Sequence, residues 1–531
     1  MPRAPAALFA LGLLAAGGAD AAAEPAAAGD LRLLAPPVPG QPGSTAAAEG
    51  RSEDRRPLTV VPSFALVSTL TDNRTLAASN RQSDWINTFS PGLRLDSSAG
   101  RMRGHLDYTL NAYVFARDSA ANTVQNALNA ALNIEAVENL AFIDLAGSIG
   151  QQSVSAFGAQ SPPGSLSVTN PNSSEVATYS VSPYLRGRLG GVAELEARLT
   201  HEATRVADAA ASDSSTTTGL LRLAQDRAVG RLGWALEARR ERVDFQAGRA
   251  TTDARARAVL TYFALPELRL AASAGRESND YAGGERESGH TVGLGLVWKP
   301  GPRTSLVAER ETRLVGSAHT LSFEHRMPSS VWRLSDTRDA SSGFGQRSPG
   351  STGSTYDLLY AQFASREPDP VRRAQLVREF LQSSGLAASA GLPGGALTSA
   401  LTDERRQSLS FAWLGLRDTL AVSATRNSGH RLDSASTAVD DLAGVLRQQG
   451  ASAELSHRLS ERAALNLSAA QLQTRSDSGG QASRLRSLSL VWSAALDRRM
   501  GWALGLRHVR FASDTAPYTE SALTASLNIG F

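Results

Sequence analysis

Residues 523–531 read "LTASLNIGF", and this stretch decides the fold class. Its even-numbered positions hold Thr, Ser, Asn and Gly, while its odd-numbered positions are apolar: Leu523, Ala525, Leu527, Ile529 and Phe531. Because the side chains of a β-strand point alternately to opposite faces, the pattern predicts a strand with one apolar and one polar face. The stretch ends on an aromatic residue and not on a polar tail, so we expect this strand to be paired along its whole length.

The same alternation recurs through the chain. It is clear in "HLDYTLNAYVFAR" (105–117), "TVGLGLVW" (291–298) and "RAALNLSAAQLQ" (462–473). In the last of these the pattern lapses after Ala469, which predicts that the strand ends there or carries a bulge. Each run is typical of a strand buried on one side, which occurs both in soluble sandwiches and in membrane barrels.

The connections between the runs favour the membrane barrel. They alternate between short turns, such as Gly190–Gly191, and long polar segments, such as residues 155–174. After Pro57 no apolar run reaches the ~20 residues of a membrane-spanning helix, whereas most runs have the ~9–11 residues of a transmembrane strand. Short turns on one side and long loops on the other are typical of outer-membrane barrels. We therefore predict an all-β antiparallel transmembrane barrel over residues 57–531, with about 22 strands (alternatives about 16 to 24).

The ends of the runs carry further signs of a barrel. Several runs have an aromatic residue near one end, as an interfacial girdle requires: Trp85, Trp234, Trp298, Trp492 and Trp502. We expect residues 523–531 to pair with the first run, residues 58–70, which closes the sheet. Leu527, Ile529 and Phe531 would then face outer-membrane lipid, and a final strand ending in Phe resembles the signal read by the outer-membrane assembly machinery.

The first residues resemble an export signal. An uncharged run follows Arg3 and is itself followed by small residues with an A-x-A pattern, so we predict a signal peptide over residues 1–23. Residues 24–56 are rich in Ala, Pro and Gly and lack the apolar content of a core, which predicts a flexible leader. Together with the barrel, this predicts a location in the bacterial outer membrane.

Composition excludes several classes of function. The chain has no cysteine, so a disulfide, a Cys-ligated metal and a thiol nucleophile are all excluded. The formal net charge is +3 and no basic tract is present, so we expect no nucleic-acid partner. The histidines have no metal-binding spacing, and no serine lies in a hydrolase motif. We expect no catalytic, cofactor or metal site, although an outer-membrane enzyme with groups gathered from distant loops is kept as an alternative.

One insertion, residues 338–402, interrupts the succession of strands. Asp369 and Pro370 form a helix start, and the apolar stripe that follows ends at Gly385; the stripe is Val371, Ala374, Val377, Phe380 and Leu381. By the alternation of connections, the insertion leaves the barrel on the long-loop side. It would cap the mouth, fold into the lumen as a plug, or form a helical ornament outside the barrel.

Charges of both signs share one parity in several runs. An Arg that faces lipid near the midplane would cost ~2–4 kcal/mol, so we expect these side chains to face the lumen. The predicted lumen-facing residues are Glu194, Glu196, Arg198, Glu237, Arg239, Glu241, Arg255, Arg257, Glu309 and Glu311. They would form either a ladder of cross-strand pairs that holds the barrel in shape or a polar conduit that hydrogen-bonds sugars.

Several longer stretches resemble a known family. They include "VVPSFALVSTLTDN" (60–73), "YSVSPYLRGRLGG" (179–191), "EPDPVRRAQLVREFLQSSGLAASAGLPGG" (367–395) and "ERRQSLSFAWLGLRDTLAVSATR" (404–426). With the terminal Phe, these resemble the PEP-CTERM system-associated outer membrane proteins of proteobacteria. The resemblance implies an outer-membrane location and an association with exopolysaccharide production or export, and it supplies no catalytic or binding residues.

These observations lead to a functional hypothesis. We expect a barrel that passes or secretes exopolysaccharide, or other polar solutes, through a charged lumen, with polysaccharide and export components as partners. The alternative is a non-conducting barrel with a structural or adhesive role at the cell surface. Lumen diameter, substrate and oligomeric state do not follow from these patterns.

Overall fold

The computed structural model describes most of the chain from residue 58 onward. The described residues are 58–97, 100–161, 170–190, 192–207, 213–246, 248–281, 283–341, 355–364, 366–367, 370–384, 396–398, 401–432, 444–477, 480–497 and 499–531. The predicted signal peptide (1–23) and leader (24–56) lie outside the described residues.

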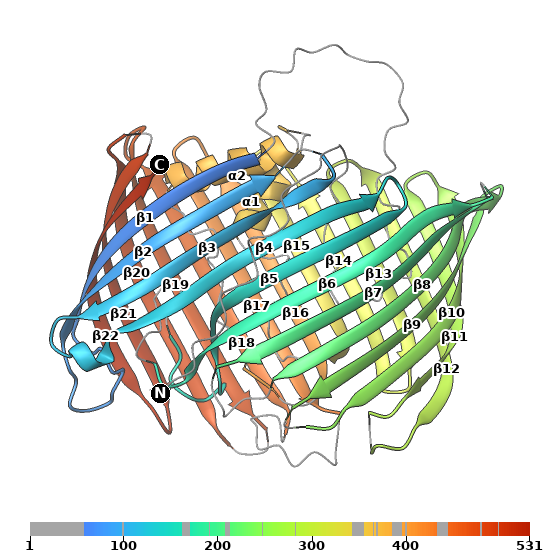
Figure 1. Cartoon of the computed structure of the whole chain (residues 1–531), viewed down its shortest axis with the longest axis horizontal. Helices are drawn as coiled ribbons and strands as arrows, with labels where there is room; N and C mark the ends of the chain where they lie inside the picture. The colour runs from blue at the N-terminus through green and yellow to red at the C-terminus, as the bar shows by residue number, and fades with distance from the viewer. Residues whose placement is uncertain are drawn as a thin grey trace, which may run out of the picture.

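A single antiparallel sheet of 22 strands forms a closed barrel (Figure 1). Its strands are β1 (Leu58–Thr71), β2 (Asp84–Ser97), β3 (Met102–Phe115), β4 (Thr123–Val137), β5 (Ala141–Ser153), β6 (Ser173–Leu189), β7 (Ala193–Val206), β8 (Ser214–Val229), β9 (Leu232–Phe245), β10 (Thr251–Leu265), β11 (Leu268–Asn279), β12 (Glu287–Gly301), β13 (Thr304–Arg313), β14 (Gly316–Arg326), β15 (Ser330–Ser341), β16 (Thr402–Leu414), β17 (Asp418–Arg431), β18 (Leu446–Arg458), β19 (Ala463–Ser476), β20 (Ala482–Ala495), β21 (Met500–Ser513) and β22 (Tyr518–Gly530). Among the described residues, three helices accompany them: η1 (Ser119–Ala121), α1 (Thr355–Phe363) and α2 (Pro370–Ser384). The predicted fold class is confirmed, including the number of strands.

The closing pair is β1 with β22. Its register runs from Ser63 opposite Gly530 to Thr71 opposite Ala522. The Phe531 amide donates to the Pro62 carbonyl at 3.0 Å, so backbone pairing continues to the last residue. This closure removes both free edges of the sheet, which is a condition for a β-structure inside lipid.

The two ends of the barrel differ in their connections. At the end where β1 starts and β22 finishes, the strands are joined by short turns, two of which place Gly190 and Gly230 at φ values of 57° and 58°. The connections at the opposite end are mostly longer, and the exceptions are Leu314–Val315 and residues 514–517. We call these the short-turn end and the long-loop end; in outer-membrane barrels they face the periplasm and the outside, respectively.

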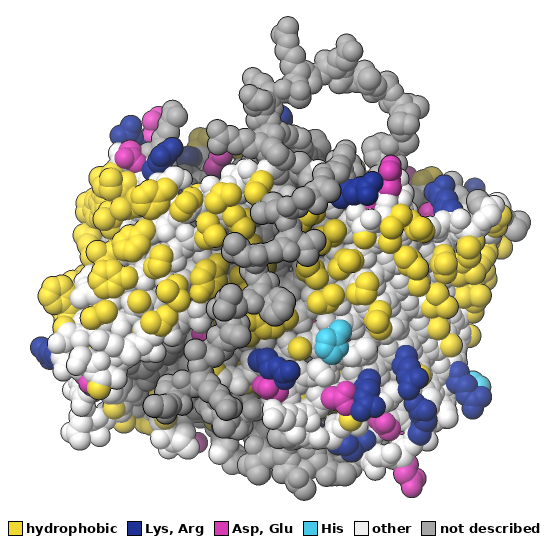
Figure 2. Space-filling model, in the orientation of Figure 1, with side chains coloured by type: hydrophobic (Ala, Val, Ile, Leu, Met, Phe, Trp, Pro, Cys, Tyr) yellow, Lys and Arg dark blue, Asp and Glu magenta, His cyan; other side chains and the backbone are white. Residues whose placement is uncertain are grey.

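Apolar side chains form a band on the outer surface. Figure 2 shows this band nearer the short-turn end, with charged side chains at that rim and in the part of the barrel nearer the long loops. Tryptophans that are about two-fifths exposed lie beside the short turns: Trp298 at 42%, Trp332 at 40%, Trp413 at 38% and Trp492 at 43%. This is the girdle expected at a membrane interface, so the outer surface is built to face lipid.

The lapse of alternation in β19 is not a strand end. The prediction of an end or a bulge after Ala469 is wrong, because β19 pairs in regular register with β20 from Ala463 to Arg475. Leu472 points into the lumen, where it packs in an apolar cluster with Phe511. Gln471 points outward and accepts a hydrogen bond from Arg486 at 3.0 Å. The apolar and polar faces of β19 are exchanged near Leu472, because this part of the barrel has an apolar inner surface and a polar outer surface.

Helices contribute little to the fold. Within the described residues, none is long and apolar enough to cross a bilayer. The predicted helix after Asp369 is α2, although Asp369 and Gly385 themselves lie outside the described residues. No pattern in the sequence predicted α1.

Candidate functional site

Strand register places the predicted ionisable side chains on one face of the sheet. Glu237 lies opposite Arg257, and Arg239 lies opposite Arg255. The positions between them, Ala238 and Ala256, point the other way, as do Leu236, which is 51% exposed, and Leu260, which is 54% exposed. Since the apolar face meets lipid, the charged face lines the lumen.

The first group of charges forms a chain of ion pairs across β8, β9, β10 and β13. The Glu237 carboxylate forms ion pairs with the guanidinium groups of Arg222 and Arg257, at N···O distances of 3.2 and 2.6 Å. Glu311 forms ion pairs with Arg257 and Arg255, at N···O distances of 3.5 and 2.9 Å. The Arg255, Arg257 and Glu311 side chains are each less than one-tenth exposed. Neighbouring charges in this group therefore neutralise one another.

A second group is centred on Arg313 of β13. Its guanidinium contacts Glu277 at 2.7 Å and Asp253 at 3.7 Å, and it also pairs with Asp339. The Arg313 side chain is only 5% exposed, and Glu277 is fully buried. One guanidinium thus contacts carboxylates from three other strands, so loss of Arg313 would leave several buried charges without their shared partner.

A third group lies on β5, β6 and β7. The Arg198 guanidinium bonds Asp144 at 2.7 Å and Glu196 at 3.2 Å. It also lies over the Tyr184 ring, 3.9 Å from its centroid. Ion pairing and the cation–π contact together fix the direction of this arginine.

The remaining predicted residues are less connected to these groups. Arg239 pairs with Glu241 within β9. Glu194 lies near a short turn, 3.4 Å from Arg188, and its side chain is 56% exposed. Glu309 is buried on the lumen face of β13, with 4% exposure. The predicted set therefore divides among separate groups and does not form one site.

Sequence reasoning missed several members of these groups. Asp253 and Arg313 share the parity of predicted residues two positions away, so the alternation could have identified them. Glu277, Asp339 and Asp144 each stand on a strand that carried no predicted charge, and only the register between strands reveals their partners.

The lumen face of β17–β22 has a different chemistry. Its pairs are mostly between neutral groups, such as Ser423 with Ser452 at 2.7 Å and Ser468 with Ser489 at 2.6 Å. Arg507 and Glu520 also form an ion pair on this face, at 3.0 Å. We call this the hydroxyl wall, and we call the lumen face of β7–β16 the charged wall.

The residues that follow β5, 154–161, fold into the lumen and pack against the hydroxyl wall. Ala156 and Phe157 are buried with Leu446 of β18. Ala159 joins the apolar cluster of Leu472 and Phe511, and the Gln160 carbonyl accepts a hydrogen bond from Tyr518. The inward loop, residues 154–161, therefore narrows the long-loop end.

Helices α1 and α2 lie at the other end of the lumen. Leu358 and Ala361 of α1 pack on Val331 and Ala412, which point inward from β15 and β16. Gln362 donates to the carbonyls of the β14–β15 turn at 3.0 and 3.1 Å. Figure 1 shows both helices at the end where the C-terminus lies. The insertion thus leaves the barrel wall at the long-loop end while its helices lie at the short-turn end.

The helices reach across the lumen from β15 to β2. They pack on each other through Leu359, Phe363, Val377 and Leu381, which are nearly fully buried. On the far side, Arg378 of α2 comes within 4.0 Å of Asp96 on β2. Of the three predicted positions for the insertion, the described helices occupy the lumen.

Open space remains beside the helices. Arg94 and Asp107 form an ion pair on the lumen face of β2 and β3, yet their side chains are 41% and 35% exposed. Among the described residues, no group of His, Asp or Glu has the arrangement of a metal site. The lumen can therefore hydrogen-bond a polar solute.

The chain was compared with known proteins in three ways. No family model matches it, and no curated protein matches it. Solved structures match as barrels. The siderophore receptor PirA from Pseudomonas aeruginosa is 10% identical at a TM-score of 0.43, over 91% of this chain and 81% of that one. The FrpB iron transporter from Neisseria meningitidis is 10% identical at 0.45, over 89% and 81%. The outer membrane protein opdK from Pseudomonas aeruginosa is 9% identical at 0.32, over 89% and 99%.

These matches describe a likeness of fold to bacterial outer-membrane barrels. At such identities and TM-scores they say nothing of what this chain binds or carries.

Proposed function

We propose that this protein passes polar, hydroxyl-rich solutes of the exopolysaccharide class across the outer membrane, and that α1 and α2 gate the passage. The observation that carries the proposal is a polar lumen whose short-turn end is crossed by helices packed on its inner wall. The choice of exopolysaccharide rests on the family resemblance of the sequence and on the chemistry of the two walls.

The walls suit a neutral or weakly charged sugar polymer. Most of the charges on the charged wall that pair across strands are already compensated by a neighbour, so no large unbalanced field selects small ions of one sign. The hydroxyl wall offers Ser and Thr side chains, which can donate or accept hydrogen bonds with sugar hydroxyls. Guanidinium and carboxylate groups on the opposite side can do the same.

The contacts of α1 with the wall are apolar and hydrogen-bonded. They include Leu358 and Ala361, the two hydrogen bonds of Gln362, and a hydrogen bond from Arg326 to the Ala361 carbonyl at 3.4 Å. Burying one leucine contributes ~1.5–3 kcal/mol, which is the range that a binding partner or solute can offset. Release of α1 from Val331 and Ala412 would enlarge the opening without breaking the sheet.

The gate is tested by single-channel recording in planar bilayers. We expect low conductance for the full chain and a severalfold increase when residues 342–400 are replaced by a short Gly/Ser linker. Heat-modifiable migration on gels would establish that both proteins form barrels. Equal conductance of the two folded proteins would rule out gating by the insertion.

The substrate class is tested in cells. Loss of the protein should reduce secreted exopolysaccharide, and the linker variant should restore secretion. Unchanged amount and composition of exopolysaccharide in the deletion strain would exclude this substrate, whatever the bilayer measurements give.

A closed structural barrel is the second candidate. The observation that favours it is obstruction at both ends, by the inward loop on one side and by α1 and α2 on the other. This candidate predicts no conductance even after the linker replacement, together with altered surface adhesion of cells that lack the protein.

A further inference from the structure

The outer surface carries a groove that the proposed transport does not use. It has a volume of about 1100 Å³ and crosses the strands from β4 to β12. Its residues lie opposite one another in adjacent strands, for example Leu199 and Gly219, Gly219 and Arg240, and Arg240 and Ala254. The groove therefore follows one row of the sheet, from near the short-turn end at Ala136 to near the long-loop end at Ser288.

The parity of its residues assigns the groove to the lipid-facing surface. On every strand that it crosses between β5 and β11, it includes two positions of outward parity with the inward residue between them, as in Ala238, Arg239 and Arg240. The outward positions share their face with Leu236 and Leu260, which belong to the apolar band. A molecule in this groove would thus lie against the barrel from the membrane side.

The groove is apolar along most of its length. Small residues form its floor, including Gly219, Ala238 and Ala254. Leu199 and Leu221 stand beside it and are exposed by 52% and 51%. Such a surface accepts an extended hydrocarbon chain, because burial of apolar area stabilises contact with an acyl chain and the small floor leaves room for it.

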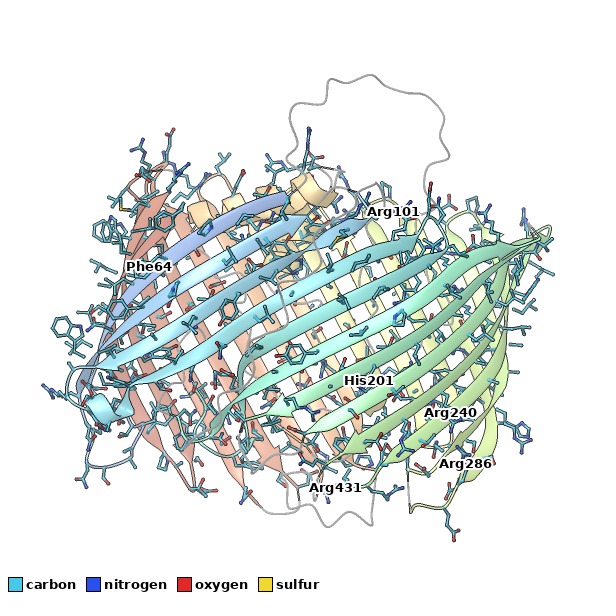
Figure 3. The ribbon with its side chains drawn as sticks, in the orientation of Figure 1. Phe64, Arg101, His201, Arg240, Arg286 and Arg431 are labelled. Carbon is cyan, nitrogen blue, oxygen red and sulfur yellow. The ribbon has the colours of Figure 1, made fainter. Side chains whose placement is uncertain are left out.

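The end nearer the long loops carries Arg240 and Arg276. Both side chains are exposed, and neither has an ion-pair or hydrogen-bond partner among the described residues. Arg240 lies opposite Ala254 of β10 and Arg276 lies opposite Ala256, so their backbones are two strands and two residues apart, or ~12 Å. Figure 3 shows Arg240 on the part of the barrel nearer the long loops.

We propose that this groove binds a phosphorylated glycolipid of the outer leaflet, with an acyl chain along the apolar floor and a phosphate on Arg240 and Arg276. Charge complementarity selects this occupant, since guanidinium groups bind phosphate through paired hydrogen bonds. An unpaired Arg that faces lipid is costly away from the interface, and an anionic headgroup removes that cost. Because long loops face outside, the arginines lie on the side of the outer leaflet.

The test uses full-length protein, delipidated in neutral detergent and studied by native mass spectrometry with added lipid. The probes are bisphosphorylated lipid A, its dephosphorylated form and phosphatidylethanolamine, and inorganic phosphate serves as competitor. We expect one molecule of the bisphosphorylated lipid to be retained in preference to the other two lipids. Arg240→Gln with Arg276→Gln should weaken its binding roughly tenfold or more.

Two further variants separate the groove from the charges. Gly219→Leu fills the floor, and it should fold because a Cβ at Gly219 meets no atom within 4 Å. It should weaken lipid binding with both arginines intact. Arg310→Gln is the matched control, because Arg310 is an exposed, outward-facing arginine that does not line the groove. It should leave binding unchanged.

Each other outcome overturns the proposal. Equal binding of dephosphorylated lipid A or phosphatidylethanolamine would show that the arginines do not select phosphate. Full displacement of the bound lipid by inorganic phosphate at low millimolar concentration would show that the apolar groove contributes nothing to lipid binding. Binding unaffected by Gly219→Leu would place the lipid elsewhere on the barrel.

Discussion

The charged wall and the hydroxyl wall hold the same sheet together in different ways. On the charged wall, buried guanidinium groups connect carboxylates across several strands, as Arg313 does for Glu277 and Asp253. On the hydroxyl wall, neutral pairs such as Ser423 with Ser452 join adjacent strands only, and apolar contacts hold the inward loop. The first wall depends on long-range charge compensation, and the second depends on packing.

This difference teaches that a cluster of lumen charges is not by itself a selectivity filter. Glu237, Arg257 and Glu311 already satisfy one another, so their net effect on a passing ion is small. Removing one partner would expose the uncompensated charge of the others. The same change on the hydroxyl wall would leave no charge behind.

The largest effect is expected where α1 packs on the charged wall. Leu358→Arg places a charge against Val331 and Ala412, which should release the helix and raise single-channel conductance severalfold. Leu376→Ser is the control, because Leu376 of α2 is 37% exposed. A similar conductance for the two variants would mean that the contact with Val331 and Ala412 does not close the lumen.

The second-largest effect is expected on the free energy of unfolding. Arg313→Gln leaves Glu277, Asp253 and Asp339 without their shared cation, and loss of one partner from a buried ion pair costs ~3–5 kcal/mol. The free energy of unfolding would be measured by urea titration of the folded band on gels. The exposed pair of Arg405 with Asp336 provides the comparison, where Arg405→Gln should cost less than ~1 kcal/mol.

The third-largest effect is expected on the ion selectivity of the lumen. In the barrel with residues 342–400 replaced, Arg257→Gln removes one positive charge beside Glu237 and Glu311 and should shift the reversal potential toward cation preference. Ser489→Ala on the hydroxyl wall should not shift it. A reversal potential that is the same for both variants would show that the ion path avoids the charged wall.

The smallest effect is expected for a single neutral pair. Ser452→Ala removes the 2.7 Å contact with Ser423 and should lower the free energy of unfolding by ~0.5–1.5 kcal/mol. Conductance and selectivity should stay as they are. A loss as large as that of Arg313→Gln would mean that the two walls do not differ in the way described.

Much of the barrel could be predicted from local patterns. Alternation identified the strands, their number and the pairing of residues 523–531 with the first strand. It also identified Arg255 and Arg257, because their parity recurs within one run. Glu277 and Asp339 escaped notice, since each depends on a partner supplied by another strand. The lapse of alternation in β19 led to a wrong prediction of a strand end or bulge for a related reason. Leu472 packs against the inward loop and does not face lipid.

By itself, the sequence determined that this chain forms a closed, lipid-facing sheet, because a two-residue period is a local property that each strand carries alone. Only the tertiary structure decided which charges compensate one another, that α1 and α2 lie at the end of the lumen opposite to the base of their insertion, and that a groove with two outward-facing arginines crosses the outer surface. These features depend on register and on contacts between residues far apart in the chain, which no local period encodes.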